Sequence, residues 1–208
     1  PSKNFNKIRH REPMLSLSNA FTEEDLINFE KKILNYLSEK KEFEIEYSAE
    51  PKIDGISASL SYENGKFIRG LSRGDGKEGE DITANLNTIQ DIPKIITSKD
   101  FPKEIDIRGE VFIQNSDFEK IKTKFANPRN TASGSLRQKN PEETKKIPLK
   151  FIAYTFGYEK GMIIKTQDEF LKKLEKWGFK INPFNKTLKG IKNLISNYQK
   201  IENKRNDL

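Results

Sequence analysis

The sequence predicts an α+β fold in which antiparallel sheets are flanked by helices. Residues 42–50 and 56–62 alternate between apolar and polar side chains, as half-buried strands do. Asn64-Gly65 follows, the strongest short signal for a β-hairpin, and residues 66–73 supply the returning strand. Because helical segments are mixed irregularly with these strands, the pattern differs from the regular alternation of a parallel βαβ fold.

Capping signals define the predicted helices. Thr22 can cap the first helix, Ser116 can cap a middle one, and Thr166 with Glu169 forms a capping box for a later one. Residues 125–135 are too rich in Asn, Pro, Gly and Ser to predict regular structure. The predicted helices cover residues 22–37, 80–89, 116–125, 166–179 and 190–205, and further strands cover residues 104–113 and 149–158.

Composition narrows the classes of protein to consider. The 208 residues are enough for one sizeable domain or two small ones, and 14 Phe with 6 Tyr can fill a core. A net charge of +7 favours a polyanionic partner such as nucleic acid, although solubility alone would also explain it. The absence of cysteine excludes disulfides and Cys-ligated zinc. No signal peptide opens the chain and no apolar run approaches the roughly 18 residues of a membrane span, so a cytoplasmic location is expected.

Three glycines match the dinucleotide-binding fingerprint by spacing alone. Gly74, Gly76 and Gly79 stand in the string GDGKEG. That fingerprint requires a parallel βαβ unit, whereas the preceding strand here is the second arm of a hairpin and hence antiparallel. The glycines therefore predict a turn rather than a nucleotide-binding loop.

Lys52 is the candidate nucleophile. An ordinary lysine is protonated at neutral pH, but burial or a neighbouring charge can free its amine for covalent catalysis. Lys52 falls between two predicted strands, at a break marked by Pro51 and Gly55, and we expect this to hold its amine at the floor of a pocket. Asp54 would lie on the same side of an extended backbone and could orient the amine or assist a metal-bound phosphate. A surface salt bridge is the alternative interpretation of Lys52 and Asp54.

The wider sequence favours the catalytic interpretation. K-x-D-G is the signature of covalent nucleotidyltransferases, and the string from residue 50 to residue 89 resembles the adenylation domain of bacterial NAD-dependent DNA ligases. Residues 10–21, 108–113 and 125–138 match further blocks of that family in the right order, so the resemblance covers nearly the whole chain. It implies the covalent nucleotidyltransferase fold.

The resemblance also implies roles for the residues of the nucleotide site. Lys52 corresponds to the lysine that takes AMP as a phosphoramidate, and Glu50 to the glutamate that reads the adenine. Ser16 and Leu17 match residues that line the adenine end of the site, and Arg73 matches an arginine at the nucleotide pocket. Hydrogen bonds and ion pairs from such groups suit an adenosine phosphate.

Four further residues receive roles in the same way. Glu110 matches the acid that contacts the ribose, or else it is a strand-end acid paired with Arg108. Asp54 matches the acid of the lysine motif, and we count it with Lys52 as catalytic. Arg129 and Arg137 correspond to arginines that bind DNA phosphates, although capping of loops would also account for them.

The resemblance implies a nick-sealing enzyme active in DNA replication and repair. NAD would supply AMP, nicked duplex DNA would accept it, and Mg²⁺ would be held by phosphates and water with no metal-ligating residues from the chain. Residues 1–208 are expected to form one monomeric adenylation domain, truncated at both ends and weak or inactive alone. An N-terminal domain for the nicotinamide mononucleotide half of NAD and C-terminal strands, OB-fold, zinc, helix-hairpin-helix and BRCT modules would be absent.

Two alternatives belong to other classes. One is a catalytically inactive module that binds adenosine or DNA without transferring AMP. The other is a nucleoside-triphosphate-dependent RNA ligase or capping-type nucleotidyltransferase. The strings GDGKEGED and FANPRN argue against the second alternative, because enzymes of that kind share only the lysine motif.

Overall fold

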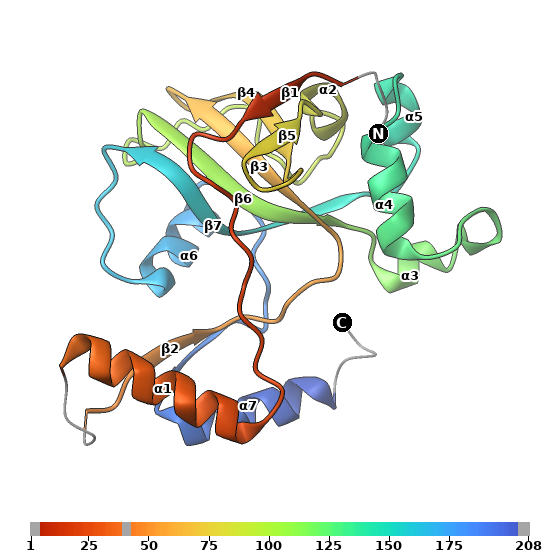
Figure 1. Ribbon diagram of the computed structural model, residues 1–208. Coiled ribbons are helices and arrows are strands. Elements are labelled where there is room, and N and C mark those ends of the chain that lie inside the picture. Colours follow the sequence, from red (N-terminus) through yellow and green to blue (C-terminus); the bar gives the residue numbers. More distant parts are fainter. Residues whose placement is uncertain (1–4, 39–42, 204–208) are drawn as a thin grey trace. The chain divides into compact units, whose positions relative to one another are not determined.

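The computed structural model describes residues 5–38 and 43–203 (Figure 1). The chain divides into two compact units. The first comprises Pro1–Leu15 and Lys52–Asn182, and the second comprises Ser16–Pro51 and Pro183–Leu208.

A four-stranded antiparallel sheet forms the centre of the first unit. Its strands run in the order β4-β3-β6-β7, so each strand has antiparallel neighbours. Asn64 and Gly65 connect β3 to β4 with φ angles of 48° and 76°, the two positive values that a type I′ hairpin turn requires. The predicted hairpin and the predicted α+β class are confirmed. The strands are β3 (Ile56–Glu63), β4 (Lys66–Ser72), β6 (Glu104–Phe112) and β7 (Lys150–Lys160).

One face of this sheet carries the hydrophobic core. The alternation predicted for β3 is confirmed, because Ala58, Leu60 and Tyr62 are fully buried. Helix α6 (Gln167–Lys176) packs on this face through a set of buried side chains, and the side chain of its N-cap, Thr166, accepts a hydrogen bond from the Glu169 N–H. The buried side chains of α6 and its C-terminus are Phe170, Leu171, Leu174 and Trp177.

Smaller elements surround the sheet. Strand β1 pairs antiparallel with β5, so that Arg9 lies opposite Glu78. Helix α5 begins at a proline after the N-cap Asn140, which accepts a hydrogen bond from the Glu142 N–H. These elements are β1 (Lys7–Arg9), β5 (Glu78–Glu80), α2 (Thr83–Leu86), α3 (Asn115–Phe118), a 3₁₀ turn (Lys122–Lys124), α4 (Pro128–Leu136) and α5 (Pro141–Lys145).

Two sequence expectations between residues 115 and 136 are wrong. Residues 125–135 were expected to be irregular, but Pro128–Leu136 forms helix α4. Asn127 caps it by accepting a hydrogen bond from the Asn130 N–H, and Pro128 occupies its first turn. Residues 116–125 were expected to form one helix, but only the short α3 and a 3₁₀ turn form there, and Ser116 lies inside α3 rather than at its cap.

The second face of the sheet is polar and is crossed by residues 10–15, which we call the strap. In Figure 1 the strap runs in front of β6, between β1 and α1. Arg11 fastens it to the sheet by pairing with Asp106, through Nε at 2.9 Å and also through Nη2, and with Glu104 at 3.1 Å. Asp106 additionally accepts a 2.6 Å hydrogen bond from Ser61.

The second unit combines two helices with a two-stranded antiparallel sheet. Thr22 caps α1 as predicted, and Asp25 completes a reciprocal capping box with it. The apolar side chains of α1 are only partly buried, since Phe29 and Leu37 are about half exposed while Leu34 is buried. The elements are α1 (Glu23–Leu37), β2 (Glu46–Ala49), β8 (Lys186–Lys189) and α7 (Ile191–Glu202).

Two predicted elements of this unit extend into residues that the structure does not describe. The strand expected over residues 42–50 is confirmed only as the shorter β2, and residue 42 is outside the described ranges. The helix expected over residues 190–205 is confirmed as α7, and residues 204 and 205 are also outside those ranges. Among the described residues, no helix combines the length and apolar character that crossing a membrane requires.

Candidate nucleotidyl-transfer site

The lysine segment joins β2 to β3 without regular structure. Residues 51–54 form neither helix nor strand, and Lys52 is exposed. The expectation that its amine lies at the floor of a pocket is therefore wrong for this structure. The reason is local: an irregular segment carries no neighbouring strand or helix turn that would cover the side chain.

Gly55 brings this segment against β6 at Glu110. A Cβ atom on Gly55 would lie 2.3 Å from the Val111 carbonyl oxygen and 3.0 Å from Glu110 Cγ, so a larger residue would force the two segments apart. The positive charge of Lys52 lowers the pKa of the Glu110 carboxyl, against the effect of burial. Gly55 thus places Lys52 next to Glu110.

Glu110 is a buried carboxylate on the polar face of β6. Ser57 Oγ donates a 2.9 Å hydrogen bond to it from the neighbouring strand β3. Burial raises the pKa of Glu110, while the Ser57 hydroxyl and the Lys52 charge act in the opposite direction. The alternative in which Glu110 pairs with Arg108 is wrong, because Arg108 donates instead to the carbonyl oxygen of Glu12.

The two predicted DNA-binding arginines lie at opposite ends of α4. Arg129, in its first turn, pairs with Asp54 of the lysine segment at 3.0 Å. Arg137, its C-cap, pairs with Glu80 at 2.8 Å. Both arginine side chains are more than half exposed, so their guanidinium groups remain accessible to phosphates. Arg129 lies within α4 and Arg137 follows its last residue, and their ion pairs would also suit a structural role, so both DNA contacts stay a prediction.

Arg73 opens the glycine-rich turn after β4. The predicted turn is confirmed, because Gly74 and Gly76 have φ angles of 58° and 89°. The Nε of Arg73 donates to the Met14 carbonyl oxygen of the strap at 3.4 Å. The carbonyl oxygen of Arg73 bonds to the ring of the buried His10 at 3.1 Å, which gives this histidine a local structural role.

Tyr154 is a site residue that the sequence analysis missed. It extends from β7 to the polar face and interacts electrostatically with Glu110 and Arg73. Burial raises the pKa of its hydroxyl. An aromatic ring at this position offers a surface on which a base can stack. Its sequence signal was weak, because an aromatic residue in an apolar strand is usually a core residue.

Three predicted nucleotide residues belong to the second unit. Ser16 and Leu17 follow the strap directly, and Leu17 is largely exposed. Glu50 accepts a 2.9 Å hydrogen bond from Ser48 Oγ. Their participation in a site with Lys52 stays a prediction.

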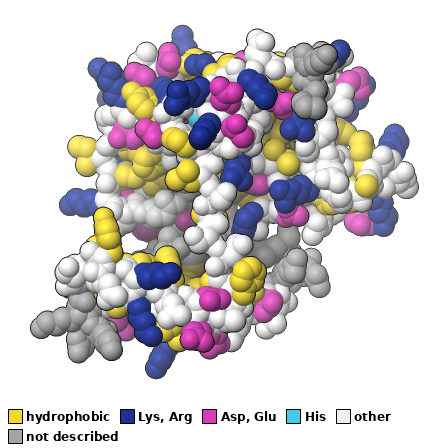
Figure 2. Space-filling view, in the orientation of Figure 1, with side chains coloured by type: hydrophobic (Ala, Val, Ile, Leu, Met, Phe, Trp, Pro, Cys, Tyr) yellow, Lys and Arg dark blue, Asp and Glu magenta, His cyan; other side chains and the backbone are white. Residues whose placement is uncertain are grey.

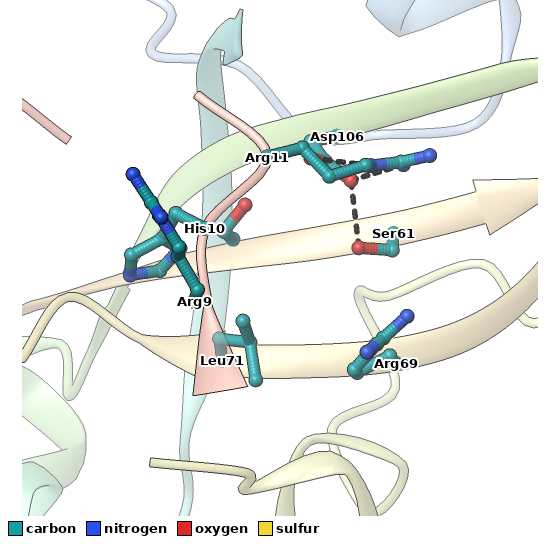
Figure 3. A pocket seen from close by; sticks show the side chains of 8 residues that line it. Arg9, His10, Arg11, Ser61, Arg69, Leu71 and Asp106 are labelled. Carbon is teal, nitrogen blue, oxygen red and sulfur yellow. Dashed lines mark hydrogen bonds and ion pairs between the residues drawn. The ribbon is translucent and has the colours of Figure 1, made fainter. Parts of the chain in front are cut away.

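A small cavity lies at the other end of the polar face from Glu110. Figure 3 shows the Arg11–Asp106–Ser61 interaction at its edge, with Arg69 pointing away from Arg9. Its arginines do not converge on a common point in this view, and Lys52 is not among its lining residues. We therefore assign the chemistry to the Lys52–Glu110 region. The cavity is lined by Arg9, His10, Arg11, Ser59, Ser61, Arg69, Leu71 and Asp106.

Comparison with known proteins matches this arrangement to a family. The family model described as "NAD-dependent DNA ligase adenylation domain" matches residues 2–208. The chain belongs to this family. The resemblance seen in the four sequence blocks is thereby confirmed, and so is the mixed fold with antiparallel sheets that it implied.

Similar curated proteins of this adenylation-domain family are named DNA ligase. The chain is 70% identical over 208 residues to one from Pelagibacter ubique, covering all of this chain and 31% of that protein. It is 45% identical over 216 residues to one from Mesorhizobium japonicum, covering all of this chain and 29% of that protein. The chain thus spans about a third of the length of the curated relatives it matches.

Proposed function

We propose that this chain is the nucleotide-transferring part of a DNA ligase, in which Lys52 takes AMP from NAD as a phosphoramidate. The AMP then serves the sealing of nicks between a 5′-phosphate and a 3′-hydroxyl in duplex DNA. Family membership supports NAD as the donor. The observation that carries the proposal is the placement of the K-x-D-G segment by Gly55 beside the buried Glu110.

The transfer step forms one bond and breaks one. The Nζ of Lys52, as the free amine, attacks the α-phosphorus of NAD, a P–N bond forms, and the P–O bond to nicotinamide mononucleotide breaks. The leaving group departs as a phosphate monoester and the amine proton passes to solvent. Because the lysine is exposed, solvent reaches it directly.

Other residues of the site bind and orient the nucleotide. Glu110 is held by the hydrogen bond from Ser57, so its carboxylate can accept hydrogen bonds from ribose hydroxyls without first reorganising. Tyr154 offers a ring for stacking and Arg73 a guanidinium for a phosphate. The family resemblance assigns the adenine contacts to Ser16, Leu17 and Glu50.

The side chains that the structure describes do not form a site for a resident metal ion. Within residues 5–38 and 43–203, no group of three or more His, Cys, Asp or Glu side chains could hold one. Mg²⁺ remains part of the proposal only as a counter-ion that arrives with the phosphates, held by them and by water. The steps above do not depend on it.

Intact-mass analysis tests the transfer. The chain is incubated with NAD and Mg²⁺, and the expected product carries one AMP on Lys52. Lys52→Ala should abolish the adduct, whereas the control Lys77→Ala, which removes another exposed lysine, should not. AMP on a different lysine would overturn the assignment. A chain that binds AMP but never forms an adduct would instead be the inactive adenosine-binding module.

Duplex DNA is the proposed macromolecular partner. On the face seen in Figure 2, lysines and arginines alternate with acidic residues, so no single-sign patch forms there. Binding should therefore be weak and salt-sensitive, with a Kd of about 10⁻⁴ to 10⁻⁶ M. Replacing Arg129 and Arg137 together by Gln should weaken it and flatten its salt dependence, as measured by fluorescence anisotropy. Unchanged binding would remove both arginines from the DNA surface.

The choice of donor separates this proposal from a triphosphate-dependent RNA ligase or capping enzyme. The chain is offered NAD, ATP or GTP in parallel mass measurements. An adduct formed with NAD alone supports the proposal. Adducts formed with a triphosphate and not with NAD would replace it with the alternative.

A further inference from the structure

Arg108 is a half-buried cation to which the proposed chemistry gives no role. It lies on the polar face of β6, two residues from Glu110, and its Nη2 donates a 2.6 Å hydrogen bond to the Glu12 carbonyl oxygen of the strap. Burial lowers the pKa of its guanidinium, and its buried Nε has no hydrogen-bond partner in the part of the chain that the structure describes. A half-buried guanidinium with an unpaired Nε costs free energy of folding, so stability alone does not explain its presence.

Gly157 on β7 makes room for this guanidinium. A Cβ atom on Gly157 would lie 2.4 Å from Nη2, 2.7 Å from Cζ and 2.8 Å from Nε of Arg108. The φ angle of Gly157 is not among the positive values of the described glycines, so its backbone conformation does not itself require glycine. The lack of a side chain at Gly157 is therefore explained by the position of the Arg108 guanidinium.

The strap that Arg108 holds continues to the predicted nucleotide residues. Two residues after Glu12, the Met14 N–H donates to the Gly76 carbonyl oxygen at 2.8 Å, and the Met14 carbonyl oxygen accepts from Arg73. The chain then runs directly into Ser16 and Leu17. A shift of the strap at Glu12 would consequently move the acceptor that orients Arg73.

We propose that Arg108, seated against Gly157, is a positioning residue for nucleotide binding: it holds the strap so that Arg73 meets the nucleotide in a fixed place. This inference rests on the proposed function. Arg108 does not touch the nucleotide in this scheme and acts only through the strap. Arg11 already fastens the strap to Asp106 and Glu104, so loss of Arg108 should displace the strap without releasing it.

Three variants of the chain test the role. Arg108→Met keeps an unbranched apolar stem and removes the donors, Arg108→Lys restores a single donor, and Gly157→Ala displaces the guanidinium while leaving it present. Two matched controls are Arg69→Met, on the same face of the sheet, and Gly134→Ala, where an added Cβ meets nothing within 4 Å. AMP and NAD affinities are measured by calorimetry at a temperature where every variant is folded, and thermal midpoints are recorded.

The expected result is a loss of affinity without a loss of stability. Arg108→Met and Gly157→Ala should each bind AMP about tenfold more weakly, the effect of losing one hydrogen bond from a charged donor, and Arg108→Lys should lie between them and the unaltered chain. The double variant should bind no more weakly than Arg108→Met, because no guanidinium is left to displace. Hydrogen exchange at the His10 and Met14 amides should quicken in the same variants, and both controls should match the unaltered chain.

Other outcomes would overturn the inference. If the variants bind AMP within twofold of the unaltered chain, or if only their thermal midpoints fall, Arg108 has a purely structural role or none. If Gly157→Ala weakens binding further when Arg108 is already Met, the glycine acts independently of the arginine. Failure of the unaltered chain to bind AMP or NAD would overturn the proposed function, and this inference with it.

Discussion

The two faces of the β3–β6 strand pair are built from alternate residues of the same segments, yet they differ in nearly every property. On one face the residues are apolar and fully buried. On the other they are serines and charged residues, joined to the strap and to the lysine segment. The core face carries Ala58, Leu60, Tyr62, Ile105, Ile107 and Val111, and the polar face carries Ser57, Ser59, Ser61, Asp106, Arg108 and Glu110.

This difference shows how one sheet can separate stability from binding. Successive strand residues point to opposite faces, so residues that are neighbours in sequence have different roles. Core residues stabilise the fold through the apolar area they bury and the volume they fill. Glu110 and Arg108 instead act through specific hydrogen bonds. Substitutions on the core face should reduce the free energy of unfolding, and those on the polar face should reduce nucleotide affinity.

The largest expected effect is on the core face. Leu60→Ala leaves a cavity opposite Ile107 and should lower the free energy of unfolding by about 3 kcal/mol, as measured by urea denaturation. Ser57→Ala, three residues earlier on the polar face, should lower it by only about 1 kcal/mol while weakening AMP binding. Equal losses of stability in the two variants would abolish the distinction between the faces.

A smaller effect of opposite sign is expected at Glu110. Because burial raises the pKa of this carboxyl, its charge destabilises the fold at neutral pH, and Glu110→Gln should raise the free energy of unfolding while weakening AMP binding. The folded chain holds this proton to a higher pH than the unfolded chain. The stabilising advantage of the variant should therefore shrink as the pH falls from 7 through the folded pKa. Urea denaturation at pH 7 and pH 5 measures it, and an advantage that grows on acidification would contradict the assignment.

Lys94 is a half-buried charge beside the core, and its effect on the free energy of unfolding has the reverse pH dependence. Burial lowers the pKa of Lys94 to about 8, while its Nζ donates to the carbonyl oxygens of Leu86 and Ile89 at 3.2 and 3.1 Å. The unfolded chain keeps this proton to about pH 10.5, so stability should rise between pH 8 and pH 10.5. The rise should be modest, because the side chain is only half-buried and solvent screens its charge. The rise in stability should be absent from Lys94→Met. Thermal unfolding between pH 8 and pH 10.5 measures it, and a stability that falls over this range would contradict the prediction.

The smallest effect on stability is expected at the exposed pair of Asp54 and Arg129. With side chains 75% and 57% exposed, this ion pair should contribute less than about 0.5 kcal/mol. Asp54→Asn should accordingly unfold like the control Lys172→Gln, which removes an ion pair to Asp168 on α6. Any loss of AMP adduct in Asp54→Asn can then be assigned to function. Adduct formation equal to that of the control would remove Asp54 from the catalytic residues.

The sequence predicted the elements whose signals are local. Alternation located β3, Asn64-Gly65 located the hairpin, and Thr166 located the start of α6, because each depends on neighbouring residues. Helix α4 was missed because the composition of its segment resembles a loop. Asn127 in fact caps the helix. The Ser135 hydroxyl donates to the Thr131 carbonyl oxygen one turn earlier, so this serine is compatible with the helix interior.

The candidate site was predicted only in part. Family motifs identified Lys52 and Glu110, but the contact made possible by Gly55 depends on how two distant strands approach each other. The contact between Arg108 and Gly157 likewise depends on the spacing of two strands, β6 and β7. No pattern in the sequence indicates it. Tyr154 was missed because periodicity in β7 does not show which aromatic residues face the core and which face the site.

The strap also imposes an order on how the chain is synthesised and folded. Arg11 is made early, but its partner Asp106 lies 95 residues later in the chain. At a synthesis rate of roughly 5 to 20 residues per second, the strap must wait about 5 to 20 seconds before its partner strand is made. The binding surface can thus be completed only after the sheet exists, so the first part of the unit to be translated is among the last to be placed.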